Sequence, residues 1–170
     1  MLASHGFGDG LDLACGDMSV KPFFQTTNYI GIDCDAARLE LAALKHPDAT
    51  AIVGKIEDNI VVGDFVLCMQ TIGFNRLFEE SRTIQTVEKL IESVRPGGTL
   101  MFNIGRPCQI HRQEIESRLR ASFNRVTARD YGALNSELPK WLSLLTAKAM
   151  YNTPILRGSG FTYYVCVDKS

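Results

Sequence analysis

The stretch Leu11-Asp12-Leu13-Ala14-Cys15-Gly16-Asp17 decides the fold, because it joins a short apolar run to a turn of small residues. We expect a buried strand over residues 11–15, a tight turn, a helix and then a second strand. The second strand is the apolar run Tyr29-Ile30-Gly31-Ile32, and it ends at the carboxylate of Asp33. A tight turn beside a carboxylate at two strand ends is typical of nucleoside sites, because a carboxylate accepts bonds from ribose hydroxyls.

Length and composition are those of an ordinary globular protein. The chain has 170 residues, of which 45% are hydrophobic and 22% charged, and its net charge is −1. We expect one domain over residues 1–170 and no bulk attraction to nucleic acid. The five cysteines form no CxxC pair, which disfavours a disulfide framework or a metal site and is typical of a cytoplasmic protein. The sequence shows no signal peptide and no run of membrane-spanning length, so we expect no membrane association.

Apolar runs alternate with stretches of helical spacing along most of the chain. Further strands are predicted over residues 50–53, 65–69, 99–104, 125–128 and 161–167. Helices are predicted from a cap at Asp35 to His46-Pro47, from a cap at Ser81 to the Pro-Gly-Gly at 96–98, and over residues 109–122. This order predicts an α/β fold with a doubly wound, mostly parallel sheet and helices on both faces.

Residues 137–151 read as a helix with a wide apolar face. We interpret this face as core or as a subunit contact, which would make a homodimer possible; a substrate-covering element is the less favoured reading.

Residues 106–129 concentrate positive charge. They hold six arginines: Arg106, Arg112, Arg118, Arg120, Arg125 and Arg129. Three pairs with glutamates stand at i,i+4 spacing: Arg112–Glu116, Glu114–Arg118 and Glu116–Arg120. We favour a solvated helix face with weak ion pairs. The alternative is a patch that contacts the phosphates of a nucleic acid.

Four segments together resemble the class I S-adenosylmethionine-dependent methyltransferase family. They are Leu-Asp-Leu-Ala-Cys-Gly-Asp at 11–17, Gly-Ile-Asp at 31–33, Asp-Phe-Val-Leu at 64–67 and Arg-Pro-Gly-Gly-Thr-Leu at 95–100. Each segment alone is a weak indication of the family, and the resemblance rests on their order and spacing together. It implies a Rossmann-like sheet with an antiparallel last strand and S-adenosylmethionine as cofactor. Little sequence precedes the first strand, so we expect the usual N-terminal covering helices to be lacking.

The resemblance also implies where the cofactor binds. Asp12 matches the family's acidic position and Gly16 its second glycine, while Ala14 and Met18 stand where the first and third glycines usually sit. Ala14 is a mild change if its φ is negative. The Met18 side chain is expected close to the methionine arm of the cofactor. The cofactor-binding residues implied in this way are Asp12, Ala14, Cys15, Gly16, Asp33, Cys34, Ile56, Glu57 and Gln70.

Two of these assignments have alternatives. Asp33 is expected on the ribose hydroxyls; a helix-capping role is the other reading, and Asp35 would serve that role equally well. After the third strand, Lys55 stands where the family often has an acidic residue. Ile56 is expected against the adenine, and Glu57 or Asp58 would accept from its amino group; a solvated charged loop is the other reading.

The loop after the fourth predicted strand is placed by position and not by a motif. Because ligands bind beyond the carboxyl ends of parallel strands, Gln70 is expected near the transferred methyl, with Phe74 and Asn75 near the substrate. Methyl transfer by in-line displacement requires orientation more than a dedicated catalytic group, so we assign no catalytic residue. Cys108 is a weak candidate nucleophile, and His111 is expected to have a surface role.

The sequence therefore predicts a methyltransferase with an unidentified acceptor, either a small molecule or a nucleic acid. One alternative is a non-catalytic protein of the same fold that acts by binding a partner. A less favoured alternative is a NAD-binding oxidoreductase, since Ala14-x-Gly16-x-x-Ser19 distantly resembles GxGxxG. Asp12 inside the first strand disfavours it, because dinucleotide enzymes usually keep that position apolar.

Overall fold

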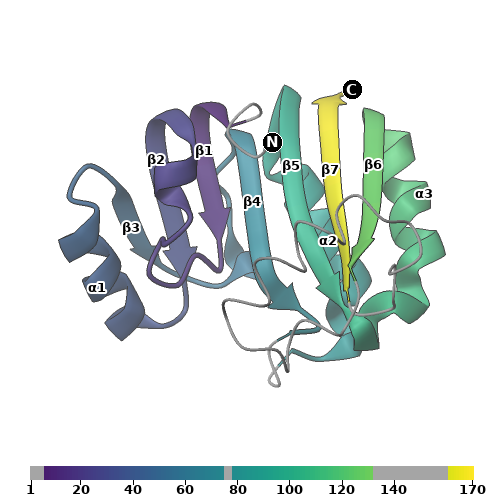
Figure 1. Cartoon of the computed structure of the whole chain (residues 1–170), viewed down its shortest axis with the longest axis horizontal. Helices are drawn as coiled ribbons and strands as arrows, with labels where there is room; N and C mark the ends of the chain where they lie inside the picture. The colour runs from purple at the N-terminus through teal and green to yellow at the C-terminus, as the bar shows by residue number, and fades with distance from the viewer. Residues whose placement is uncertain (1–5, 75–77, 132–160) are drawn as a thin grey trace.

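A seven-stranded sheet forms the centre of the molecule (Figure 1). The computed structural model describes residues 6–74, 78–131 and 161–170. The strands are β1 (Phe7–Leu13), β2 (Gln25–Asp33), β3 (Thr50–Val53), β4 (Gly63–Ile72), β5 (Val94–Gly105), β6 (Phe123–Tyr131) and β7 (Phe161–Lys169). Their order is β3-β2-β1-β4-β5-β7-β6; β1 to β5 pair in parallel, and β7 is antiparallel to both of its neighbours. The predicted mostly parallel α/β sheet with an antiparallel last strand is confirmed.

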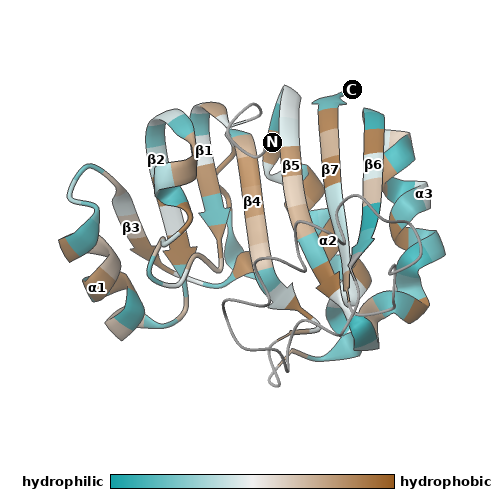
Figure 2. Ribbon diagram, viewed as in Figure 1, coloured by the Kyte–Doolittle hydropathy of each residue, from teal (hydrophilic) through white to brown (hydrophobic). Residues whose placement is uncertain are grey.

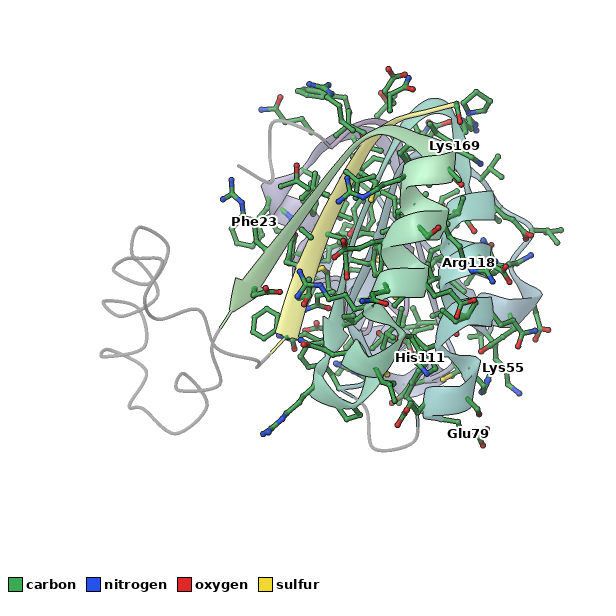
Figure 3. The ribbon with its side chains drawn as sticks, turned by 90° about the vertical axis from the view of Figure 1, so that its right-hand side faces the viewer. Phe23, Lys55, Glu79, His111, Arg118 and Lys169 are labelled. Carbon is green, nitrogen blue, oxygen red and sulfur yellow. The ribbon has the colours of Figure 1, made fainter. Side chains whose placement is uncertain are left out.

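Helices cover both faces of the sheet, also as predicted. They are α1 (Ala36–Lys45), α2 (Thr83–Glu92) and α3 (Arg112–Ser122). The apolar faces of α2 and α3 pack in one core with Leu11, Val66 and Phe102. Helix α1 belongs to a second core, on the other face, that contains Met18, Phe24, Tyr29, Leu39, Ala42, Phe65, Leu67 and Met101. Figure 2 shows the hydrophobic strands between these layers, and Figure 3 shows α3, marked by Arg118, on one side of the sheet.

The helix predicted between the first two strands is wrong. The connection from β1 to β2 contains only a 3-10 turn over Lys21–Phe23. Pro22 lies in this turn, which ends where the Phe24 N–H donates to the Lys21 carbonyl at 3.1 Å. The chain instead buries Met18 and Phe24 as a packed loop. The connection from β3 to β4 is equally short, with one 3-10 turn over Ile56–Asp58.

Other boundaries differ in smaller ways. Ser81 does not cap α2: it lies in the 3-10 turn Glu80–Arg82, and Arg82 is the residue that precedes the helix. The stretch 96–98 falls inside β5, where Gly97 has a φ of 75°. Asp35 does cap α1, because its Oδ1 accepts a bond from the Arg38 N–H at 3.2 Å, and the helix ends at His46 as predicted.

The apolar stretch 137–151, with the homodimer contact predicted on it, lies outside the described residues. Among the helices that the structure describes, none has the length and apolar character needed to cross a membrane.

Candidate functional site

The carboxyl ends of β1, β2, β4 and β5 lie along one edge of the sheet (Figure 1). The chain leaves β1 toward β2 on one side, and it leaves β4 toward β5 on the other. The strand order therefore reverses between β1 and β4, and a crevice at such a reversal is where ligands bind open α/β sheets. The predicted site residues lie at the carboxyl ends of strands or in the segments that follow them.

The side chain of Asp33 joins the ends of β1 and β2. Its Oδ2 accepts a bond from the Gly16 N–H at 2.7 Å, and its Oδ1 accepts one from the Asp35 N–H at 2.9 Å. The Asp33 residue is only 8% exposed. Because each carboxylate oxygen has two lone pairs, both oxygens keep capacity for a further donor. Asp35 takes the helix-capping role, and Asp33 is left beside the turn.

The turn after β1 is built from left-handed residues. Ala14 has a φ of 60°, Gly16 of 54° and Met18 of 53°. The expectation of a negative φ at Ala14 is wrong: the chain turns left-handed there, and the next residue, Cys15, donates its N–H to the Ile32 carbonyl at 3.1 Å. A non-glycine residue in this region costs about 1–2 kcal/mol, so the turn stores strain at two positions.

Met18 does not reach the open edge of the sheet. It has 0% exposure and packs in the core beneath the turn with Leu39 and Phe65. A Cβ on Gly31 would lie 2.7 Å from Cys15 Sγ and would collide with the end of the Met18 side chain. The expectation that Met18 projects toward the cofactor is therefore wrong, because glycine at position 31 gives its side chain a place in the core.

Asp12 is buried beside the turn. Its Oδ2 accepts a bond from the Tyr29 hydroxyl at 2.8 Å. Burial raises the pKa of Asp12 to about 7; the Tyr29 bond opposes this rise, and the negative charge of Asp33 adds to it. Burial and these two carboxylates also raise the pKa of Cys15, so its thiol stays neutral, and it donates to the Gly16 carbonyl at 3.7 Å.

Arg38 was not among the predicted site residues, yet its guanidinium lies over Gly16 in the turn. A Cβ added to Gly16 would lie 2.7 Å from the Arg38 terminal nitrogen, and the φ of 54° at Gly16 also favours glycine. The available signal was the position of Arg38 three residues after the Asp35 cap, which aims it back over the start of the helix. Lys45, at the other end of α1, pairs with Asp17 at 2.5 Å and holds the same helix to the turn.

The segment after β3 is compatible both with adenine binding and with a solvated charged loop. Cys34 and Asp58 are exposed, while Ile56 is partly buried against the larger core. Glu57 forms an ion pair with Arg82, a partner that the sequence did not indicate. The roles predicted for these residues toward adenine stay predictions. In Figure 3, Lys55 lies at the same end of the molecule as Glu79 and His111.

Gln70 marks an irregularity at the end of β4. It is exposed, its φ is 55°, and its N–H donates to Asn103 Oδ1 at 2.7 Å. Asn103 is only 3% exposed and lies on β5. Sequence reasoning missed it, although an asparagine inside the apolar run 99–104 was the available signal, since a buried amide needs partners.

Three residues of the neighbouring loops have structural contacts. Cys108 is buried against Gly73, and burial raises the pKa of its thiol, which disfavours a nucleophilic role. His111 is half-buried, with its Nε2 3.8 Å from a Glu80 carboxylate oxygen. Phe74 packs edge-on against Phe161, with 5.7 Å between ring centroids. Asn75 lies outside the described residues.

All three predicted arginine–glutamate pairs are present on α3. Glu116 accepts from Arg112 at 2.8 Å and lies 3.6 Å from Arg120, and Glu114 accepts from Arg118 at 2.6 Å. Arg112 and Arg118 also pair with acidic residues of other elements. Much of the predicted positive patch is therefore balanced locally. A nucleic acid contact through residues 106–129 stays a prediction.

The strand order with β7 antiparallel between β5 and β6 defines the class of fold. Solved structures with this fold include a protein assigned as a methyltransferase, in a complex with the Haloferax volcanii Trm112 methyltransferase activator: TM-score 0.65, 16% identity, 98% of this chain and 84% of that chain covered. Another is the N-methyltransferase NodS of Bradyrhizobium japonicum with S-adenosylhomocysteine: TM-score 0.64, 10% identity, 98% and 81% covered. A third is an rRNA methylase of Streptococcus thermophilus: TM-score 0.58, 13% identity, 98% and 91% covered.

This protein therefore has the fold of the class I S-adenosylmethionine-dependent methyltransferases. Identities this low show a shared fold and nothing further. No protein-family model matches the sequence, and no curated protein sequence matches it.

Proposed function

We propose that the protein is an S-adenosylmethionine-dependent methyltransferase. The observation that carries this proposal is the carboxylate of Asp33, which accepts the Gly16 N–H at 2.7 Å and so fixes a turn and an acidic group side by side. In a nucleoside site of this kind, the turn approaches the ligand closely and the carboxylate accepts ribose hydroxyls.

The residues around the contact between Asp33 and Gly16 are compatible with an adenosyl ligand. The oxygens of Asp33 have lone pairs left for two hydroxyl donors. Met18 is buried in the core with Leu39 and Phe65, so its side chain does not lie at the surface of the turn. Cys34 and Ile56 follow β2 and β3 on the side proposed for adenine, and Gln70 lies near the carboxyl end of β4 on the side proposed for the methyl group.

The cofactor would supply a methyl group on a positively charged sulfur, already activated for displacement. In the transfer, the acceptor lone pair would form the new bond to carbon, the carbon–sulfur bond would break with its electron pair going to sulfur, and an acceptor proton would leave to water. Such a reaction requires the acceptor atom to be held about 3–3.5 Å from the methyl carbon, in line with the bond that breaks. Asp33 and Gly16 would fix the ribose end, and the segment after β4 would orient the acceptor.

A second function is a non-catalytic protein of the same fold. The observation that favours it is that both Asp33 oxygens already hold backbone N–H groups, so the turn is complete without a ligand. An oxidoreductase is disfavoured, because buried Asp12 with a raised pKa stands under the turn where a dinucleotide site would place an apolar residue.

Calorimetric titration with S-adenosylhomocysteine, S-adenosylmethionine and NAD separates these functions. We expect micromolar binding of the two adenosyl ligands and no binding of NAD. Failure of both adenosyl ligands to bind at millimolar concentration would favour the non-catalytic protein. Binding of NAD alone would favour the oxidoreductase.

A further inference from the structure

The end of β4 departs from the regular ladder with β5. Cys68 lies opposite Phe102 and Ile72 lies opposite Ile104, so three residues of β4 face a single residue of β5. Residues 69–71 are therefore bulged out of the sheet, and the Thr71 hydroxyl donates to the Met69 carbonyl at 3.2 Å within the bulge. Bulges beside a ligand crevice turn a side chain in a new direction.

Asn103 is the residue of β5 that faces the bulge. Its side-chain oxygen, rather than a backbone carbonyl, accepts the Gln70 N–H at 2.7 Å. This bond fixes Gln70 at a φ of 55°, a conformation that a non-glycine residue adopts only against strain. Strained backbone persists where its surroundings hold it in place, and such sites are often functional.

A second contact fixes the far end of the bulge. A Cβ on Gly105 would collide with the carbonyl of Gly73, and a Cβ on Gly73 would lie 2.8 Å from Cys108 Sγ. The loops after β4 and β5 are thus pressed together through two glycines. The backbone of the bulge is therefore held at both ends. The side chain of Gln70 is exposed and can contact a ligand.

We propose that Asn103 is a positioning residue that holds Gln70 out of the ladder so that the Gln70 side-chain oxygen faces the transferred methyl. This inference rests on the proposed function and adds a class of acceptor to it. An amide oxygen accepts hydrogen bonds and takes no proton. It orients a nucleophile that has an N–H or O–H hydrogen, and it offers nothing to a thioether or a carbon nucleophile.

Sinefungin tests this without knowledge of the acceptor, because it has an amine-bearing carbon in place of the methylated sulfur. Its N–H groups lie where the acceptor meets the methyl. In calorimetry we expect the unaltered protein to bind sinefungin about tenfold more tightly than S-adenosylhomocysteine, as one charge-assisted hydrogen bond implies. Gln70→Ala and Asn103→Ala should each bring this ratio close to one and change the affinity for S-adenosylhomocysteine by less than about twofold.

Two matched control variants distinguish the positioning role of Asn103 from a general loss of stability. Gln25→Ala removes the same side chain from an exposed site at the opposite edge of the sheet. Asn59→Ala removes a buried asparagine that bonds to Ser93 and Val61, far from the bulge in the chain. Both should keep the tenfold ratio, although Asn59→Ala should lower the melting temperature.

The outcomes are distinct. If the unaltered protein binds both ligands with the same ratio as Gln70→Ala, the inference is overturned and the proposed function stands. An Asn103→Ala variant that keeps the ratio while Gln70→Ala loses it would overturn the positioning role. If neither ligand binds the unaltered protein, the proposed function and this inference fail together.

Discussion

The ends of β1 and β4 use the same device with different chemistry. After β1, the Gly16 N–H donates to a buried side-chain oxygen of Asp33 on β2; in β4, the Gln70 N–H donates to a buried side-chain oxygen of Asn103 on β5. Both segments contain a non-glycine residue with a left-handed φ, Ala14 in the first and Gln70 in the second. In each case a neighbouring strand holds a strained segment at the carboxyl edge.

The difference between them is charge. The first segment lies beside two buried carboxylates, Asp12 and Asp33, whereas the acceptor at the second is a neutral amide. A carboxylate is suited to hydroxyl donors of a sugar, and an amide to a group that must be oriented without taking its proton. We therefore propose nucleoside binding for the first segment and acceptor orientation for the second.

The largest expected effect concerns pH and belongs to the first segment alone. The folded protein raises the pKa of Asp12 from 3.8 to about 7, so folding favours its protonated form. This contribution to stability is present at low pH and is lost as pH rises from about 4 to about 7. The Asp12→Asn variant does not titrate at this position. Relative to it, the free energy of unfolding of the unaltered protein should fall by up to about 4 kcal/mol over that range.

Chemical denaturation of both proteins between pH 4 and pH 8 measures this difference. Asn103→Ser serves as the control from the second segment, and its difference from the unaltered protein should not vary with pH. A constant difference between Asp12→Asn and the unaltered protein would show that Asp12 is not a buried acid.

Cofactor affinity should also depend on the first segment only. Asp33→Ala removes the acceptor proposed for the ribose hydroxyls and should weaken S-adenosylhomocysteine binding by about 1–3 kcal/mol. Calorimetry with Asn103→Ala should show an affinity within about twofold of the unaltered protein. An equal loss of affinity in Asp33→Ala and Asn103→Ala would contradict the proposal that only the first segment binds the nucleoside.

Stability should fall when the second segment loses its acceptor. Asn103→Ala leaves the Gln70 N–H without its partner and should lower the free energy of unfolding by about 1–3 kcal/mol. Gln70→Gly should stabilise the unaltered protein, because glycine adopts the left-handed φ of this position freely. It should have little effect in the Asn103→Ala background, because residue 70 is no longer held in that conformation there. Additive effects in denaturant titrations would contradict the coupling between these residues.

The smallest effect comes from relief of strain in the first segment. Ala14→Gly should raise the free energy of unfolding by about 1 kcal/mol, since glycine adopts a left-handed φ freely. Ala43→Gly, on the exposed side of α1, is the matched control and should lower it by about 1 kcal/mol. If both substitutions destabilise the protein equally in thermal denaturation, Ala14 is not left-handed in solution.

Much of the fold could be predicted from the sequence, because hydrophobic period and turn residues determine it locally. The end of β2 at Asp33 and the cap at Asp35 are of this kind. The missing helix between β1 and β2 could not be predicted in this way. It depends on how Met18 and Phe24 pack in the core beneath the turn, which is a tertiary contact.

The site was predictable only where a residue type and a strand end coincide, as at Asp33. Arg38 over Gly16 and the pair Glu57–Arg82 join residues of different elements, and no local pattern encodes them. The bond from Gln70 to Asn103 spans 33 residues, so only the paired strands bring its two ends together.

We propose that Asp33 holds the ribose of an adenosyl ligand. Calorimetry that compares S-adenosylhomocysteine with its 2′,3′-dideoxy analogue, on the unaltered protein and on Asp33→Ala, tests this proposal. We expect the unaltered protein to prefer the natural ribose by about 10–100-fold and the variant to prefer neither ligand. An equal preference in both proteins would contradict it.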